Sequence, residues 1–156
     1  MSKNAHAAKG TYLLLAQLNH EADIRVGRLG KFCFAAGWYA YAGSALGPGG
    51  LPARLARHRH TDKRLHWHID YLLRYAVLET IWQVAYPKRL ECAWAAAVQG
   101  LPGAQGPVRG FGASDCRCTT HLVFLPRRPS DRIITAALSG RSPAKADIRC
   151  PPWPAP

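Results

Sequence analysis

Two tyrosines, an arginine and a histidine have the types and spacing that could handle a phosphate ester. Tyr12 and Tyr41 lie in apolar, strand-forming segments, and Arg54 and His58 follow four residues apart. A tyrosine hydroxyl can accept a proton when a nearby cation lowers its pKa, and a guanidinium pairs with phosphate oxygens. Tyrosines on strands more often pack in a core, so packing is the simpler interpretation of these two residues alone.

A second group is rich in histidine and ends in an aspartate. His66 and His68 are two residues apart, which on a regular helix separates their directions by roughly 200°. They could therefore converge on a metal ion only if one of them precedes the helix. We interpret both as surface or helix-entry histidines near phosphate, and Asp70 as a cap of the helix or a partner of His66.

A third group combines three cysteines with one histidine: Cys92, Cys116, Cys118 and His121. The Cys-x-Cys-x-x-His run does not have standard zinc-finger spacing, although with Cys92 it would supply four ligands for a structural Zn²⁺. Buried free cysteines are the simpler interpretation. The chain has five cysteines, an odd number that favours a reducing compartment, and we expect a cytoplasmic protein.

The charge of the chain favours an anionic partner. There are 21 Lys and Arg residues against nine Asp and Glu residues, for a formal net charge of +12. Neutralising phosphates releases counterions, so this excess favours nucleic acid. We expect Arg57, Arg59, Lys63 and Arg64 to form a track for its backbone. The chain has no apolar run long enough for a membrane span or a signal peptide, and we expect no membrane partner.

Strands and helices alternate along the chain in an order that predicts an α+β fold of antiparallel strands with interleaved helices. We expect a flexible lead-in over residues 1–9, one domain over 10–126, and a disordered Arg- and Pro-rich tail over 127–156. Strands are predicted over 11–18, 24–26, 31–34, 37–43, 77–84 and 121–125, and helices over 51–60, 67–75 and 90–98. The segments 31–34 and 37–43 are expected to pair as a hairpin.

Short motifs join the candidate residues in a recognisable order. Gly10-Thr11-Tyr12 and Tyr41-Ala42-Gly43 are followed by Arg54 in one predicted helix and by Glu91 at the start of another. This order resembles the GIY-YIG nuclease superfamily. Longer runs resemble its DUF123 branch, also called Uri-superfamily endonucleases, over about residues 10–125: Val26-Gly27-Arg28-Leu29-Gly30, Tyr39 to Ala45, His66 to Leu73, Glu91-Cys92, Phe111 to Cys116, and His121-Leu122.

The resemblance implies a metal-dependent endonuclease, with DNA favoured over RNA, and a small three-stranded sheet with flanking helices and an extra C-terminal strand. It implies Tyr41 as the general base, with Tyr12 shaping the site or sharing that role. Arg54 would hold the scissile phosphate, and His58 would bond Tyr41 or the phosphate. Glu91 would hold one Mg²⁺ or Mn²⁺.

The sequence departs from the superfamily pattern at several positions. Thr11 and Ala42 replace the two isoleucines of the signature, and Ser44, which we expect near the nucleic acid, stands where other members often have a lysine. Many members also have a late asparagine, whereas this chain has only Asn4 and Asn19. Ser114, Asp115 and His121 are the candidate polar substitutes. Two alternatives therefore stay open: a catalytically silent nucleic-acid-binding module, and a zinc-stabilised interaction protein.

Overall fold

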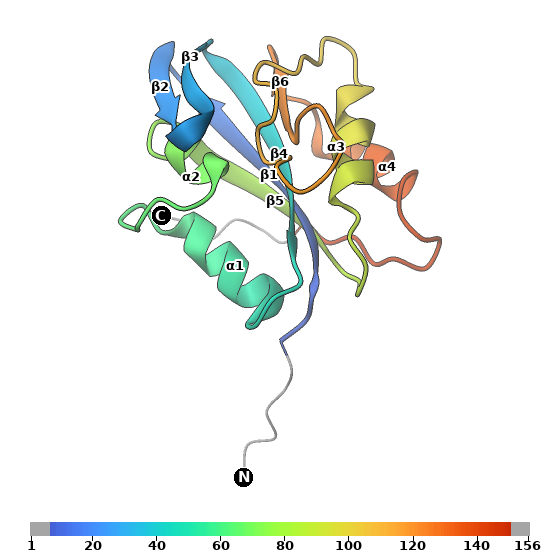
Figure 1. Cartoon of the computed structure of the whole chain (residues 1–156). Coiled ribbons are helices and arrows are strands. Elements are labelled where there is room, and N and C mark those ends of the chain that lie inside the picture. Colours follow the sequence, from blue (N-terminus) through green and yellow to red (C-terminus); the bar gives the residue numbers. More distant parts are fainter. Residues whose placement is uncertain (1–6, 151–156) are drawn as a thin grey trace.

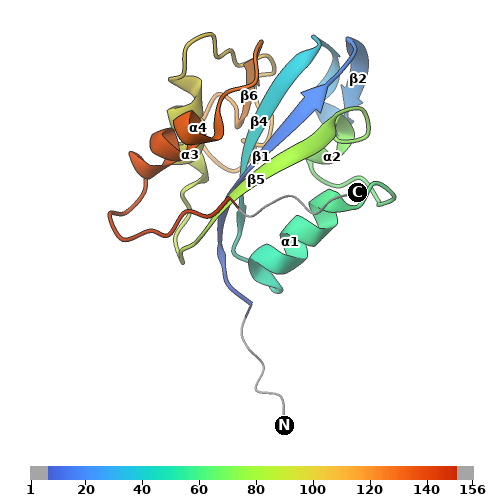
Figure 2. The ribbon, with the colours of Figure 1, turned by 180° about the vertical axis from the view of Figure 1, so that it is seen from behind.

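A computed structural model describes residues 7–150, and helices cover both faces of its main sheet (Figures 1 and 2). The elements in chain order are β1 (Gly10–Leu18), β2 (Ala22–Val26), the 3-10 turn η1 (Gly27–Leu29), β3 (Gly30–Phe34), β4 (Gly37–Ala45), α1 (Gly50–Arg59), α2 (His68–Leu72), β5 (Val77–Ala85), α3 (Glu91–Gln99), β6 (Leu122–Leu125) and α4 (Asp131–Ser139).

The main sheet has the strand order β5-β1-β4-β6, and every neighbouring pair is antiparallel. The register of β1 and β4 places Tyr12 opposite Gly43 and Leu14 opposite Tyr41. The predicted α+β class is confirmed. The three long strands β5, β1 and β4 form the expected three-stranded core of the sheet, and β6 is the extra C-terminal strand.

Two hydrophobic cores lie on opposite faces of this sheet, because side chains of a strand alternate between its faces. Tyr12 and Leu14 point into the core that contains Leu51 and Leu55 of α1. Leu13 and Leu15 point into the other core, with Trp94 of α3 and Ile134 of α4. The continuous apolar run in β1 follows from burial on both faces.

Both edges of the main sheet are bridged by short segments of the chain. Gln83 of β5 exchanges two backbone hydrogen bonds with Arg149, at 2.8 and 2.9 Å. Phe124 of β6 forms the same kind of pair with Gln105, at 2.7 and 2.9 Å. Segments before β6 and after α4 thus cover part of each edge strand.

The predicted hairpin of 31–34 with 37–43 is wrong. The segment 30–34, β3, pairs with β2 in a separate two-stranded sheet, while β4 pairs with β1 and β6. The apolar residues of β4 are buried on both sides, and only a central position in the main sheet achieves this. The helix predicted over 67–75 forms only as the short α2, His68–Leu72.

The prediction of a disordered tail is wrong for the segment Asp131–Ser139, which forms α4. The hydroxyl of Ser130 accepts a hydrogen bond from the backbone N–H of Ile133 and caps the helix. Ile134 and Leu138, four residues apart, are fully buried against the second core. Burial of these two side chains stabilises a helix whose flanking composition is typical of disorder.

Parts of the expected lead-in (1–6) and tail (151–156) lie outside the described residues. No helix within residues 7–150 combines the length and apolar character that crossing a membrane requires.

Candidate functional site

A cavity of about 480 Å³ opens between α1, α2, the start of α3 and the loop that precedes β6. It brings together Tyr12 of β1, Tyr41 of β4, Arg54 of α1 and Glu91 of α3, which are far apart in the sequence. Its lining consists of Tyr12, Tyr41, Gly43, Ser44, Leu46, Gly47, Arg54, His66, Trp67, His68, Arg89, Glu91, Gly112, Ser114 and Asp115.

Tyr12 has a buried histidine as its partner. The Nε2 atom of His58 lies 2.8 Å from the Tyr12 hydroxyl oxygen, and both side chains are buried. Burial raises the pKa of Tyr12 to about 12, and the nearby Arg54 guanidinium acts in the opposite direction. Burial lowers the pKa of His58 to about 3, so its imidazole is neutral at physiological pH. The sequence predicts that His58 bonds Tyr41 or the phosphate, whereas in the structure it bonds Tyr12.

The Tyr41 ring packs edge-on against Phe111, with ring centroids 5.9 Å apart. Burial raises the pKa of Tyr41 well above its ordinary value, and Tyr12 and Glu91 raise it further. Among the described residues the Tyr41 hydroxyl has no hydrogen-bond partner, and it faces the cavity. This hydroxyl is therefore available to a molecule in the cavity.

Two glycines make room for the tyrosines. A Cβ atom at Gly43 would lie 2.5 Å from the Tyr12 hydroxyl, and one at Gly112 would lie 2.6 Å from the Tyr41 ring. Gly112 also has a φ of +67°, a conformation that residues with side chains rarely adopt. Position 43 of the second signature motif therefore requires glycine, because the side chain of Tyr12 on the neighbouring strand occupies the space that a Cβ atom would need.

Arg54 is held by two contacts that leave its charge intact. Its Nη1 donates a hydrogen bond of 3.2 Å to the backbone carbonyl of Ser44, and its guanidinium lies 4.0 Å from the centre of a Trp67 ring. Stacking on an aromatic face restricts the side chain without neutralising it. Arg54 therefore presents a fixed cation to the cavity.

Glu91 is buried and lies at the first residue of α3, where the helix dipole favours negative charge. The Thr11 hydroxyl accepts a 3.1 Å hydrogen bond from the N–H of Leu90 and thereby ties β1 to the start of this helix. Arg89 lies 3.6 Å from Glu91 and 3.0 Å from Asp115, so it bridges two carboxylates on the cavity wall. Thr11, which replaces an isoleucine of the superfamily signature, therefore has a structural role: its hydroxyl connects β1 to α3.

Asp70 has the structural role expected of it. Its Oδ2 accepts hydrogen bonds from the backbone N–H groups of His66 and Trp67, both at 2.9 Å. Arg57 donates to the same oxygen at 2.7 Å, and Lys63 lies 3.5 Å from the other. Burial acts to raise the pKa of Asp70, but these hydrogen bonds and cations more than offset it, and the net shift is downward.

The expected nucleic-acid track is thereby divided. Arg57 and Lys63 direct their charges at a buried aspartate, whereas Arg59 and Arg64 are exposed. Ser44, predicted to lie near the nucleic acid, lines the cavity. His66 and His68 also line it, and His68 Nδ1 accepts a 2.9 Å hydrogen bond from the N–H of Gly112. The two histidines do not converge with Asp70 on a metal position.

The cysteine group does converge. The ligand atoms of Cys92, Cys116, Cys118 and His121 lie within 4.8 Å of one another, and residues 7–150 contain no other such group of three or more His, Cys, Asp or Glu side chains. Burial, followed by hydrogen bonds with Cys118 and Cys116, raises the pKa of the Cys92 thiol to about 12. These four side chains could hold a metal ion.

Arg89 received no role from the sequence, although it lines the cavity and contacts both carboxylates. Its only local signal is a position two residues before Glu91, ahead of a predicted helix. Of the three candidate substitutes for the missing asparagine, Ser114 and Asp115 line the cavity, whereas His121 points to the cysteines.

Comparison with known proteins gives one family. The family model described as "Domain of unknown function DUF123" matches residues 11–141, which is most of the chain. No curated protein and no solved structure matches the sequence. The cavity, α3 and α4 all lie within the matched span. The chain therefore belongs to the DUF123 family.

Proposed function

We propose that this chain is a GIY-YIG-type nuclease that hydrolyses phosphodiester bonds in nucleic acid, DNA in preference to RNA, with one Mg²⁺ or Mn²⁺. One observation carries the proposal: Tyr12, Tyr41, Arg54 and Glu91 come from four different elements and line one cavity. Together they comprise a proton acceptor, a phosphate-binding cation and a carboxylate around a single space.

Arg54 is the residue that would bind the scissile phosphate. Its contacts with Ser44 and Trp67 fix the guanidinium before any substrate arrives, so little side-chain entropy is lost on binding. A fixed cation also stabilises the negative charge that develops on the phosphate in the transition state. The formal charge of +12 supports a polyanionic substrate.

Tyr41 is the better candidate for the general base, because its hydroxyl faces the cavity without a protein partner among residues 7–150. The Tyr12 hydroxyl, in contrast, is already engaged by His58. Burial raises the pKa of both phenols, so a proton acceptor at this position needs nearby positive charge. Arg54 lowers the pKa of each tyrosine and supplies part of that charge.

Glu91 would hold the divalent ion, together with water and, at the outer wall, Asp115. The fit rests on a buried carboxylate that lines the cavity while its nearest cation, Arg89, lies 3.6 Å away. Hard cations of this kind bind few protein oxygens and keep several waters. When bound, such an ion lowers the energy of negative charge on phosphate and leaving oxygens.

The test is a cleavage assay with purified protein on labelled single-stranded DNA, duplex, flap, junction and RNA substrates. Each substrate is incubated with Mg²⁺, Mn²⁺ or EDTA. We expect metal-dependent cleavage by the natural chain and by Glu21→Gln, an exposed carboxylate control, and none by Glu91→Gln. Cleavage by Glu91→Gln at the natural rate would remove Glu91 from the proposed site. Binding without cleavage on every substrate would favour the silent binding module.

A further inference from the structure

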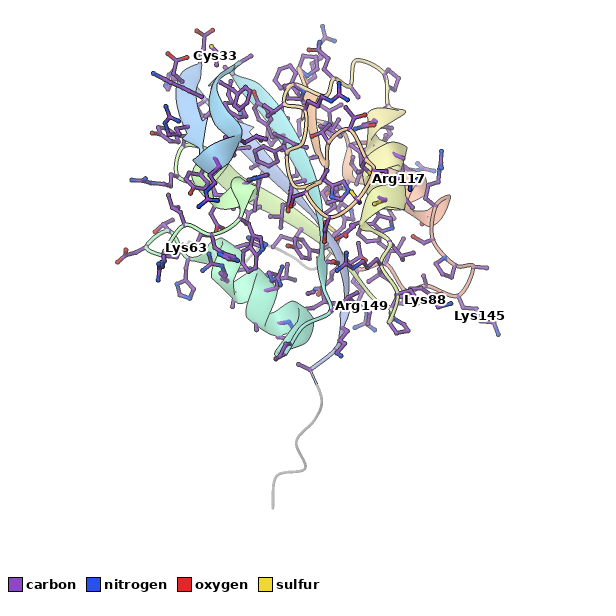
Figure 3. The ribbon with its side chains drawn as sticks, in the orientation of Figure 1. Cys33, Lys63, Lys88, Arg117, Lys145 and Arg149 are labelled. Carbon is purple, nitrogen blue, oxygen red and sulfur yellow. The ribbon has the colours of Figure 1, made fainter. Side chains whose placement is uncertain are left out.

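The four side chains of the cysteine group come from three separate parts of the fold. Cys92 lies in the first turn of α3, Cys116 and Cys118 lie in the loop between α3 and β6, and His121 directly precedes β6. Figure 3 shows Arg117, the residue between the two loop cysteines, beside α3. Their meeting is therefore a product of tertiary structure and not of a local motif.

Two separations between ligand atoms match a tetrahedral centre. The Sγ atoms of Cys92 and Cys116 each lie 3.4 Å from His121 Nε2. Zinc–sulfur and zinc–nitrogen bonds of ordinary length, arranged tetrahedrally, place sulfur and nitrogen roughly 3.5 Å apart. Cys92, Cys116 and His121 thus already have nearly the spacing that an ion would require, and all four ligand atoms lie within 4.8 Å of one another.

The position of His121 is fixed by its neighbours in the fold. Gly112 lies directly beside this side chain, since a Cβ atom added at Gly112 would be 3.3 Å from the Cβ atom of His121. The backbone of His121 is fixed by an N–H bond of 2.8 Å to the carbonyl of Phe111 and by a carbonyl that accepts from Ala42 at 3.2 Å. This orientation keeps Nε2 directed at the two sulfur atoms.

We propose that Cys92, Cys116, Cys118 and His121 bind one Zn²⁺ in a closed structural site. Three thiolates and an imidazole form a soft donor set that selects zinc over Mg²⁺. Four protein ligands leave no open position for water or substrate, which is the arrangement of structural and not catalytic zinc. Zinc binding by these four side chains does not depend on the proposed nuclease activity.

The zinc would fasten the loop before β6 to α3. Glu91 directly precedes Cys92, and Asp115 directly precedes Cys116, so each cavity carboxylate is the chain neighbour of a zinc ligand. Few backbone hydrogen bonds hold the loop between residues 112 and 119, because it forms no strand. A bound ion would therefore fix the cavity wall that Ser114 and Asp115 form.

The first test needs no variant. The full chain, purified under reducing conditions without added metal, is analysed for zinc and then alkylated with iodoacetamide before mass spectrometry. We expect one zinc per chain and labelling of Cys33 and Cys150 only, both of which are exposed. After treatment with a strong chelator, all five cysteines should be labelled. Absence of zinc, or labelling of the three cluster cysteines to the same extent before and after chelation, would overturn the proposal.

The second test examines ligand geometry with Co²⁺ in place of zinc. The natural chain should give the visible absorption of tetrahedral Co²⁺ together with sulfur-to-cobalt charge transfer. Cys116→Ser and Cys118→Ser should bind zinc at least ~10-fold more weakly. Cys33→Ser, in β3 of the two-stranded sheet and labelled in Figure 3, is the matched control and should bind zinc with the affinity of the natural chain. An octahedral Co²⁺ spectrum, or a disulfide among the cluster cysteines in the reduced protein, would contradict a Cys₃His zinc site.

Discussion

The Nε2 atom of His58 lies 2.8 Å from the hydroxyl oxygen of Tyr12, at the junction of α1 with the central strand β1. The other ring nitrogen, Nδ1, is buried and has no hydrogen-bond partner within residues 7–150. This hydrogen bond therefore connects α1 to β1. A protonated His58 would carry a buried N–H at Nδ1 that no acceptor within residues 7–150 satisfies.

This burial makes stability depend on pH. The pKa of His58 is lowered to about 3, chiefly by burial and then by Lys63, with Asp70 acting in the opposite direction. Since the unfolded chain binds the proton at the ordinary histidine pKa near 6.5, the folded state loses stability as pH falls from about 6.5 towards 3. We expect a loss on the order of a few kcal/mol, measured by urea unfolding at about pH 7, 5.5 and 4.5.

The matched comparison for this effect is His58→Phe against His20→Gln, in which an exposed histidine is replaced. His58→Phe should flatten the decline between about pH 6.5 and 4.5, whereas His20→Gln should leave it unchanged. An equally steep decline in His58→Phe would mean that other groups carry the acid sensitivity.

Removal of the Tyr41 hydroxyl separates rate from binding. Tyr41→Phe keeps the ring contact with Phe111 and should lower the cleavage rate by ~100-fold or more, the usual contribution of a general base. Nucleic-acid affinity should stay within ~3-fold, since the ring and Arg54 remain. Single-turnover cleavage and fluorescence anisotropy measure the two quantities. Tyr75→Phe, at an exposed tyrosine, controls for the loss of a hydroxyl elsewhere.

Tyr12→Phe should also lower the rate, but it should destabilise the fold as well, by ~1–2 kcal/mol, because the His58 ring loses its hydrogen bond while staying buried. A Tyr41→Phe protein that cleaves at the natural rate, beside an inactive Tyr12→Phe protein, would transfer the base role to Tyr12.

Substitution of Arg54 tests the geometry of its cation. Arg54→Lys keeps the charge but loses the planar fork and the stacking on Trp67, so we expect a slower rate with moderately weaker binding. Arg54→Ala should lose both rate and affinity and reduce the salt dependence of binding by about one phosphate contact. Salt titrations of DNA binding measure this slope. Arg25→Ala, an exposed charge on β2, should change the salt slope less than Arg54→Ala does.

Gly43→Ala tests the close approach of the two central strands. The added Cβ would lie 2.5 Å from the Tyr12 hydroxyl, so the phenol must move away from His58. We expect a loss of ~1–3 kcal/mol in unfolding free energy and a large fall in cleavage rate. Gly47→Ala, in the loop that follows, has no atom within 4 Å of the new methyl group and should keep the unfolding free energy of the natural chain. Equal stability of the two variants would contradict the close approach of Gly43 to Tyr12.

Local patterns were sufficient to predict β1, α1 and α3, because long apolar runs and helical spacing within one element determine them. The sequence also predicted Tyr12, Tyr41, Arg54 and Glu91 as one group, although their meeting in a cavity depends on the register of β1 with β4. That part of the candidate site came from the resemblance and not from periodicity.

Properties that depend on distant partners were not predictable in this way. The residues of β3 have the same strand preference whether they pair with β2 or with β4. The spacing of Ile134 and Leu138 indicates a helix, but its stability comes from the core beneath it. The sequence alone does not reveal that Arg57 and Lys63 pair with Asp70, because the fold buries that carboxylate beside them.

The bridges at Gln83–Arg149 and Gln105–Phe124 have a consequence for how copies of this chain meet one another. An edge strand with unpaired N–H and C=O groups is a template on which another chain can add a strand and begin aggregation. Here segments of the chain's own backbone form hydrogen bonds with part of each outer strand of the main sheet. We therefore expect that loosening either segment would first appear as self-association through the exposed edge, before any loss of the central strands.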